Sequence, residues 1–263
     1  MTVFNSSRAF LLPTLILALA SFACAAVILA VTVSRRPQAD TDDRVSEPAY
    51  LHRLVEGARF LRSDRLLSSV VAMVATTNWL DAAYAAVLLP VWIHDHGYDT
   101  TELGLIGMTF ALAATGGSLM ATAMAGRLPR RLVFLGGFML CGAPRFVVLA
   151  LEAPIWGILV TVAIGGFGAG FINPVLGAIF FERVPAPLIG RVSALEDSLC
   201  WSGVPLGGIS AAAAIAAFGL SPALFIAGGI YLAATLVPGL RPEWREMDRE
   251  RSTDQPSRTT TPV

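Results

Sequence analysis

Apolar residues along this chain are grouped in long runs, separated by short polar segments. Each run is close to the roughly 20 residues that a helix needs to cross a hydrocarbon core about 30 Å thick. The sequence therefore predicts an all-α polytopic membrane protein with seven transmembrane helices. The predicted spans cover residues 9–33, 66–93, 103–126, 132–151, 155–178, 192–217 and 221–240.

The polar segments outside the spans predict the remaining organisation of the chain. Residues 34–48 are interpreted as a linker and 49–64 as a short amphipathic helix lying on the membrane, with its leucines on one side. The expected units are a first transmembrane helix with a short outer N-terminus (1–33), an arginine-rich linker and amphipathic helix (34–65), a six-helix bundle (66–240) and a disordered cytoplasmic tail (241–263).

The distribution of arginine predicts an orientation in the membrane. All 19 basic residues are arginine, and 17 of them lie in the linker, in the loops after the third and fifth spans, and in the tail. The other loops, residues 94–102, 152–154 and 218–222, hold none. Because short cytoplasmic loops carry the excess of basic residues, we expect the N-terminus outside and the C-terminus inside a bacterial inner membrane.

Composition excludes several classes of function. The chain is 55% hydrophobic with zero formal net charge, so we expect a bilayer and a small-molecule substrate as partners and no nucleic acid. The three cysteines, Cys24, Cys141 and Cys200, lie inside apolar spans without ligand spacing. His94 and His96 form only a weak metal signal. We expect no metal, no cofactor and no catalytic residue, and hence no enzyme.

A polar stripe interrupts the second span near its middle. Thr77, Asn78, Asp81 and Tyr84 fall within an arc of about 120° on a helix. A carboxylate at that depth costs about 2.5–3.5 kcal/mol, so Asp81 is expected to have a partner, to face a watery cavity or to be protonated. Asp81 is thus a candidate for proton or cation coupling. The alternative is a structural hydrogen bond between helices.

Arg145 is the second ionisable residue expected inside the membrane. An arginine stays charged and needs a carboxylate or several carbonyl groups. Asp81 and Glu152 are both possible partners. Alternatively, Arg145 lies near the outer surface and extends its guanidinium to the headgroups.

Proline and glycine residues predict breaks and close contacts in the later spans. Gly166 and Gly170 form a GxxxG pair that favours close helix packing. Three prolines each free a carbonyl group four residues earlier and bend the helix, which suggests a cavity with gating helices. These prolines are Pro144, Pro174 and Pro205, and Asn173 lies beside the second.

Charged residues surround the start of the sixth span. Glu196 and Asp197 are expected in its first turns, where they cap the helix and pair with Arg183 or Arg191, or form a cytoplasmic gate with them. Trp201, a little further on, is expected to line the cavity or to face lipid.

Several motifs in order resemble transporters of the major facilitator superfamily, in the branch of bacterial multidrug, macrolide and siderophore exporters. The similar stretches are VEGARFLRSDRLL (55–67), AGRLPRRLVFLGG (125–137), GGFGAGFINPVL (165–176), ERVPAPLIGRVSAL (182–195) and PLGG (205–208). The resemblance implies a fold of twelve helices in two six-helix halves, of which this chain aligns with the sixth through twelfth. The loop at 127–131 lacks the acidic residue usual in the family.

The combined prediction is the C-terminal part of an exporter of amphipathic small molecules, driven by the proton motive force through alternating access. Asp81 and Arg145 are assigned to coupling, and Asn78, Tyr84, Asn173 and Trp201 to the substrate cavity. Two alternatives stay open. The chain is a half-transporter that needs a missing N-terminal half or a second copy, or it is an inactive remnant or membrane anchor.

Overall fold

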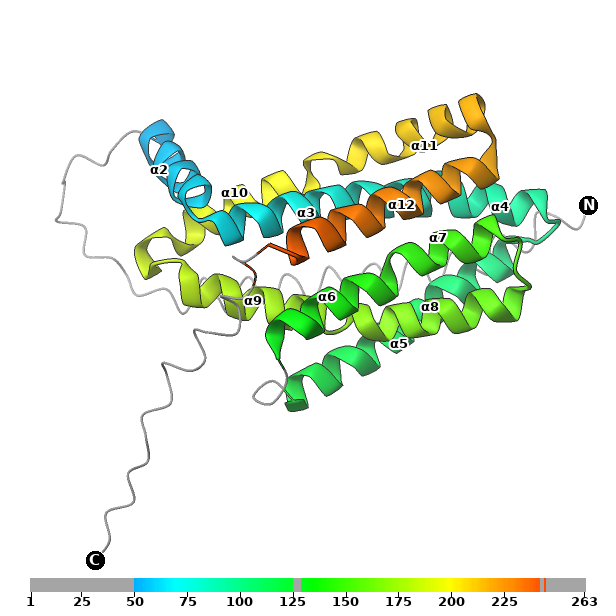
Figure 1. The fold of residues 1–263 in the computed structure, drawn as a ribbon, viewed down its shortest axis with the longest axis horizontal. Coiled ribbons are helices and arrows are strands. Elements are labelled where there is room, and N and C mark those ends of the chain that lie inside the picture. The colour runs from blue at the N-terminus through cyan, green and yellow to red at the C-terminus, as the bar shows by residue number, and fades with distance from the viewer. Residues whose placement is uncertain (1–49, 125–128, 242–243, 245–263) are drawn as a thin grey trace, which may run out of the picture. The chain divides into compact units, whose positions relative to one another are not determined.

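The computed structural model describes residues 50–124, 129–241 and 244. The predicted first span at 9–33, the linker at 34–48 and most of the predicted tail lie outside these described residues. The described elements form a bundle of helices (Figure 1). They are α2 (Tyr50–Ser63), α3 (Arg65–Ala83), η1 (Tyr84–Leu88), α4 (Leu89–Asp95), α5 (Thr100–Met124), α6 (Arg130–Cys141), α7 (Ala143–Ala150), α8 (Ile155–Ala169), α9 (Ile172–Arg183), η2 (Ala186–Leu188), α10 (Ile189–Ser202), α11 (Val204–Phe218) and α12 (Leu220–Gly239).

Within the described part of the chain, six helical segments are long and apolar enough to cross a membrane. They confirm the spans predicted from residue 66 onward to within a few residues at most ends. Two of them, α5 and α12, are continuous. The other four are interrupted and consist of α3–η1–α4, α6–α7, α8–α9 and η2–α10–α11.

The interruptions lie near the prolines. Gly142 separates α6 from α7 two residues before Pro144, and Gly203 separates α10 from α11 two residues before Pro205. The break between α8 and α9 falls at Gly170 and Phe171, just before Pro174. Because a proline has no N–H, the preceding turn loses a hydrogen bond and the helix can end there.

A turn of π-helix, which the sequence reasoning missed, occupies Tyr84–Leu88. It is followed by Pro90, and the N–H of Leu89 bonds to the carbonyl of Tyr84, five residues back. Such bulges change the direction in which side chains point and are frequent at functional sites. Here the bulge begins three residues after Asp81.

Glycines allow α5 and α8 to approach closely, and these two helices share the most extensive contact in the bundle. A Cβ atom at Gly166 would lie 2.5 Å from the carbonyl oxygen of Phe110, and one at Gly170 would lie 2.3 Å from that of Ala114. On the facing helix, a Cβ atom at Gly117 would lie 2.1 Å from the carbonyl oxygen of Phe167. Backbone therefore packs on backbone, as in other small-residue helix interfaces.

One end of the bundle holds most of the described arginines, and we call it the arginine-rich end. The helices α3, α6 and α10 begin there, and α5, α9 and α12 finish there (Figure 1). Asp64 caps α3 by accepting hydrogen bonds from the N–H groups of Leu66 and Leu67. Trp244 lies after α12, is fully buried and donates to Ser69 Oγ at 3.0 Å. The prediction of a disordered tail from residue 241 is therefore wrong at Trp244, because its indole is packed inside the bundle.

At the opposite end, polar residues form the turns. Asp99 accepts a hydrogen bond from the N–H of Thr101, which keeps the pKa of this exposed carboxyl below its ordinary value. Glu102 accepts from the N–H of Asp99 in return, so the two form a capping box for α5. Glu152 ends α7 with a φ of 53°, a position that glycine usually takes.

Candidate transport site

The polar stripe of α3 faces other helices of the bundle. Asn78 donates from Nδ2 to the carbonyl of Cys200 at 3.0 Å. In an uninterrupted helix that carbonyl would accept from Val204, but the break at Gly203 separates α10 from α11. The Asn78 side chain therefore supplies a donor to a carbonyl near the helix break. Backbone polar groups within a membrane need such a partner, because no water is available to them there.

Asp81 is the partner of Arg145. An Nη atom of Arg145 donates to a carboxylate oxygen of Asp81, which joins α3 to the first turn of α7. Glu152, the other candidate, is an exposed residue of the turn after α7. The structure therefore shows Arg145 in an ion pair inside the bundle, and not with its guanidinium extended to the outer surface.

The two members of this pair differ in accessibility. The Arg145 side chain is 12% exposed, whereas that of Asp81 is 42% exposed. An arginine keeps its charge at any relevant pH, while a carboxylate can gain and lose a proton. The arginine side chain is thus covered by protein, and the carboxylate is the more exposed member of the pair.

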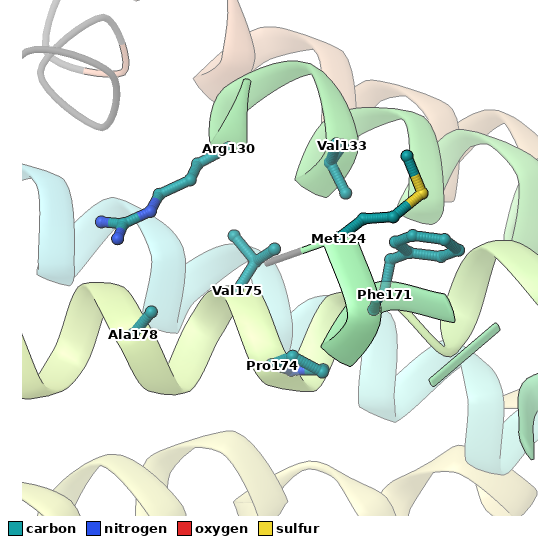
Figure 2. A pocket seen from close by; sticks show the side chains of 8 residues that line it. Met124, Arg130, Val133, Phe171, Pro174, Val175 and Ala178 are labelled. Atoms are coloured by element: carbon teal, nitrogen blue, oxygen red, sulfur yellow. The ribbon is translucent and has the colours of Figure 1, made fainter. Parts of the chain in front are cut away.

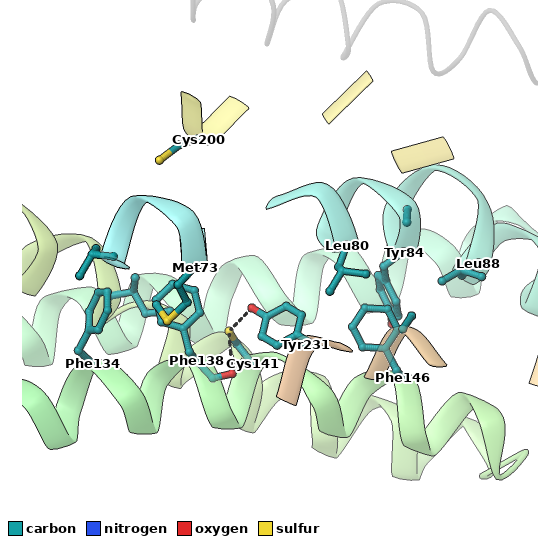
Figure 3. Packing of buried hydrophobic residues seen from close by; sticks show 14 of the residues in the cluster. Met73, Leu80, Tyr84, Leu88, Phe134, Phe138, Cys141, Phe146, Cys200 and Tyr231 are labelled. Carbon is teal, nitrogen blue, oxygen red and sulfur yellow. Dashed lines mark hydrogen bonds between the residues drawn. The ribbon is translucent and has the colours of Figure 1, made fainter. Parts of the chain in front are cut away.

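Aromatic rings enclose the guanidinium of Arg145. Its Cζ atom lies 4.6 Å from the ring centre of Tyr84, 5.1 Å from that of Phe146 and 5.7 Å from that of Tyr231. Ring faces attract a cation, and the attraction is stronger away from water. Figure 3 shows Tyr84 and Phe146 side by side, with Tyr231 closer to Cys141.

Gly142 makes room for one of these rings. A Cβ atom at this position would lie 1.9 Å from Cε1 of Tyr231. The break between α6 and α7 therefore admits the Tyr231 ring, and its hydroxyl lies 3.6 Å from Sγ of Cys141. Sequence reasoning missed Tyr231, since a single tyrosine in an apolar span has no neighbouring polar residue to distinguish it.

Two hydrogen-bond donors at the site lack an acceptor among the described residues. They are the hydroxyl of Tyr84 and Nε of Arg145, and both are buried. A buried donor without a partner is costly, so these groups are suited to a water molecule or to an oxygen of a bound molecule.

The two remaining residues assigned to the cavity, Asn173 and Trp201, are exposed. Asn173 is exposed on α9 and lines a separate cavity of about 420 Å³ between α5 and the α8–α9 break, together with Ser118 and Gly170. Trp201 is 63% exposed. The structure thus gathers Asn78, Asp81, Tyr84 and Arg145 around the α3–α7 and α3–α10 contacts and places Asn173 apart from them.

The charges assigned to a gate form several pairs at the arginine-rich end. Arg183 donates to Asp64 at 2.8 Å, and Arg191 donates to Glu56 at 2.7 Å. Glu196 and Asp197 lie in the third turn of α10, because this helix begins at Ile189, three residues before the predicted start. They are therefore too far along the helix to cap it, and the prediction that placed them in the first turns is wrong.

A smaller cavity of about 150 Å³ lies between the end of α5, the start of α6 and α9. Figure 2 shows Met124 and Phe171 close together in its wall, with Arg130 extending from the first turn of α6. Arg130 forms two hydrogen bonds with Glu182, one of 2.7 Å, so the start of α6 is tied to α9.

The last two histidines of the chain lie at the end of α4, away from this site. The ring of His96 stacks on Trp92 with 3.9 Å between the ring centres. The structure groups no three His, Cys, Asp or Glu side chains in a metal-binding arrangement among the residues that it describes. The contact of His96 with Trp92 is a packing contact.

Broken apolar helices with a polar site at their discontinuities are typical of polytopic membrane transporters. The chain belongs to the Major Facilitator Superfamily, since the model of that family matches residues 71–261. This assignment agrees with the resemblance in the sequence motifs.

The chain is also similar to proteins that are named as multidrug efflux pumps. The chain is 31% identical over 229 residues to the multidrug efflux pump Tap of Mycolicibacterium fortuitum. The aligned region covers 87% of this chain and 55% of the relative. It is 29% identical over 223 residues to the multidrug efflux pump Tap of Mycobacterium tuberculosis (strain ATCC 25618 / H37Rv), with 84% and 52% covered. The chain spans about half the length of the curated relatives it matches.

Proposed function

We propose that this chain forms one wall of an exporter of amphipathic small molecules in a bacterial plasma membrane, with its arginine-rich end in the cytoplasm. The observation that carries the proposal is the Asp81–Arg145 pair, in which the carboxylate is open and the arginine covered. The relatives named as multidrug efflux pumps support the substrate class.

In the proposed mechanism, Asp81 alternates between two partners. When it is ionised, Asp81 is neutralised by Arg145, which the aromatic rings hold in place. When a proton or a cationic group of the substrate binds Asp81, the attraction across α3 and α7 weakens. Asp81 thereby couples proton uptake to a change in the contact between two helices, as alternating access driven by the proton motive force requires.

The coupling role is tested by changing Asp81 to Asn and measuring export of ethidium, a fluorescent amphipathic cation. Bacterial cells would express the chain alone or together with the amino-terminal half of the Mycolicibacterium fortuitum relative. We expect export that a protonophore abolishes, and we expect Asp81→Asn to lose it because the amide cannot carry a proton. Asp81→Glu should retain part of the export.

Asp95→Asn is the matched control, since it makes the same change at an exposed position on α4. Protonophore-sensitive export that survives Asp81→Asn would show that coupling does not depend on this residue. If the chain gives no export either alone or with the amino-terminal half of the relative, the hypothesis that it is an inactive remnant or a membrane anchor is favoured.

The second candidate is a half-transporter that works only with a second bundle. Two spans with little buried surface favour this candidate. In an apolar stretch of 18 residues, 11% of the residues are buried in α5 and 17% in η2–α10–α11, whereas 39% are buried in α3–η1–α4. Apolar faces of this extent contact either lipid or another protein. A second bundle, supplied by an N-terminal half or a second copy, would cover them and complete a path between two walls.

A further inference from the structure

The helix α2 has one buried face and one basic face. Gly57 and Leu61 are buried, and a Cβ atom at Gly57 would lie 3.6 Å from the side chain of Arg191 on α10. Arg59 and Arg62 lie on the other side of the helix, since they project about 160° and 140° from Gly57 at 100° per residue. Both are exposed.

The apolar side of α2 is covered by protein where its side chains are described. Leu61 is 4% exposed and belongs to the core of the bundle. An interfacial helix normally buries its apolar side in the lipid. The described part of α2 uses that side to dock on α3 and α10 instead, which leaves its charged side for contact with the surroundings.

The charges of this region are sorted by side. The acidic residues of α2 and of the turn after it form ion pairs within the bundle: Glu56 pairs with Arg191, and Asp64 pairs with Arg183. Arg59, Arg62 and Arg65, which we call the arginine face, are exposed and have no ion pair within the part of the chain that the structure describes.

The arginine face is also placed at the edge of a membrane span. Arg65 is the first residue of the 31-residue apolar segment Arg65–Asp95, and α2 ends one residue before Asp64, the cap of α3. In Figure 1, α2 lies at the end of α3 and is inclined to it. Such a position corresponds to the level at which lipid headgroups meet the protein.

We infer that the arginine face is a docking surface for the headgroups of anionic phospholipids. Guanidinium groups bind phosphate with two parallel hydrogen bonds, and clustered basic residues next to a membrane helix are attracted by an anionic leaflet. By holding α2, such lipids also hold Glu56 and Asp64, and through them Arg191 and Arg183. The inference does not depend on transport by the chain.

The test compares the full chain in nanodiscs of phosphatidylcholine and in nanodiscs containing phosphatidylglycerol. Hydrogen–deuterium exchange of the α2 amides is measured in each. We expect exchange in α2 to be about tenfold slower with the anionic lipid, because each of the three basic residues is attracted by the charged surface. The difference should disappear in about 1 M salt, where the Debye length is roughly 3 Å.

The triple variant Arg59→Gln, Arg62→Gln and Arg65→Gln should lose the lipid-dependent slowing. Its matched control changes three arginines of the tail, Arg249, Arg251 and Arg258, to glutamine and should keep it. Equal exchange rates of α2 in the two bilayers of the unchanged chain would overturn the inference, independently of any variant. So would equal slowing by inorganic phosphate in phosphatidylcholine nanodiscs, since the ligand would then not be a lipid.

Discussion

At the scale of single residues, Asp81 and Arg145 explain each other's presence in an apolar bundle. Moving either charge alone out of water is costly, and the pair with its aromatic surroundings reduces that cost. The environment differs for the two groups, because Arg145 is enclosed by three rings and Asp81 keeps one open side. This asymmetry gives the two residues unequal effects on stability.

We expect Asp81→Asn to destabilise the protein more than Arg145→Gln. The first change leaves a covered cation without its partner, whereas the second leaves a carboxylate that already has access to the surroundings. The double variant should lose less free energy of unfolding than the two single variants lose together. The difference, the coupling energy, should be about 1–3 kcal/mol. Thermal unfolding of the four proteins in detergent measures it, and purely additive effects would argue that the two side chains do not interact.

Asp64 performs two tasks that substitution can separate. One carboxylate oxygen caps α3, and the other accepts from Arg183 at 2.8 Å. Asp64→Asn keeps a capping oxygen and removes the charge, whereas Asp64→Ala removes both. We expect Asp64→Ala to lower the free energy of unfolding by about 1 kcal/mol more than Asp64→Asn does.

Denaturation with urea or heat measures that difference, with Arg183→Gln as the control that removes the arginine and keeps the cap. If the Asn and Ala variants are equally stable, the cap does not contribute and only the ion pair matters. The comparison therefore assigns each part of the loss to one oxygen.

At the scale of elements, the contact of α5 with α8 depends on glycines that face the partner helix. Gly117 and Gly116 are neighbours on α5 and differ in surroundings: a Cβ atom at Gly117 would meet the backbone of Phe167, and one at Gly116 meets nothing within 4 Å. Sequence alone does not distinguish the two, because which of them faces α8 is set by the rotation of α5 in the bundle.

Gly117→Ala is expected to destabilise the bundle by about 1–3 kcal/mol, since the helices must separate to admit the methyl group. Gly116→Ala is its matched control and should be neutral or stabilising by up to about 1 kcal/mol, because alanine favours a helix. Melting temperatures of the two variants decide between these outcomes. Equal effects would mean that α5 and α8 do not pack through this glycine.

At the scale of the whole molecule, α5 and α11 carry exposed apolar faces. Leu112 on α5 is 65% exposed and Ile209 on α11 is 69% exposed. A photo-crosslinking amino acid at either position should give protein adducts in the membrane if a second bundle covers these faces. Val237 on α12, which is 56% exposed, is the control position and should give lipid adducts only.

Protein adducts at Leu112 and Ile209 would support a partner chain or a second copy, and their mass distinguishes the two. Lipid adducts at all three positions would show that these faces contact the bilayer. That result would count against the half-transporter and favour a chain that acts alone or an inactive remnant.

The sequence by itself determined the membrane class, the six described spans and the approximate positions of the helix breaks. These properties depend on local chemistry: the length of apolar runs sets the spans, and a proline removes a hydrogen bond wherever it stands. The family resemblance also followed from local motifs. The roles of Asp81, Asn173 and the other assigned residues stay predictions.

Only the tertiary structure decided which side chains meet. It paired Arg145 with Asp81 instead of Glu152, inserted Tyr231 beside Gly142, buried Trp244 and placed Asn173 in a separate cavity. It also added the π-helical turn at Tyr84–Leu88 and turned Arg59 and Arg62 of α2 outward. The physical reason is that the rotation and depth of each helix follow from its packing against the others, and a periodic pattern within one helix does not contain that information.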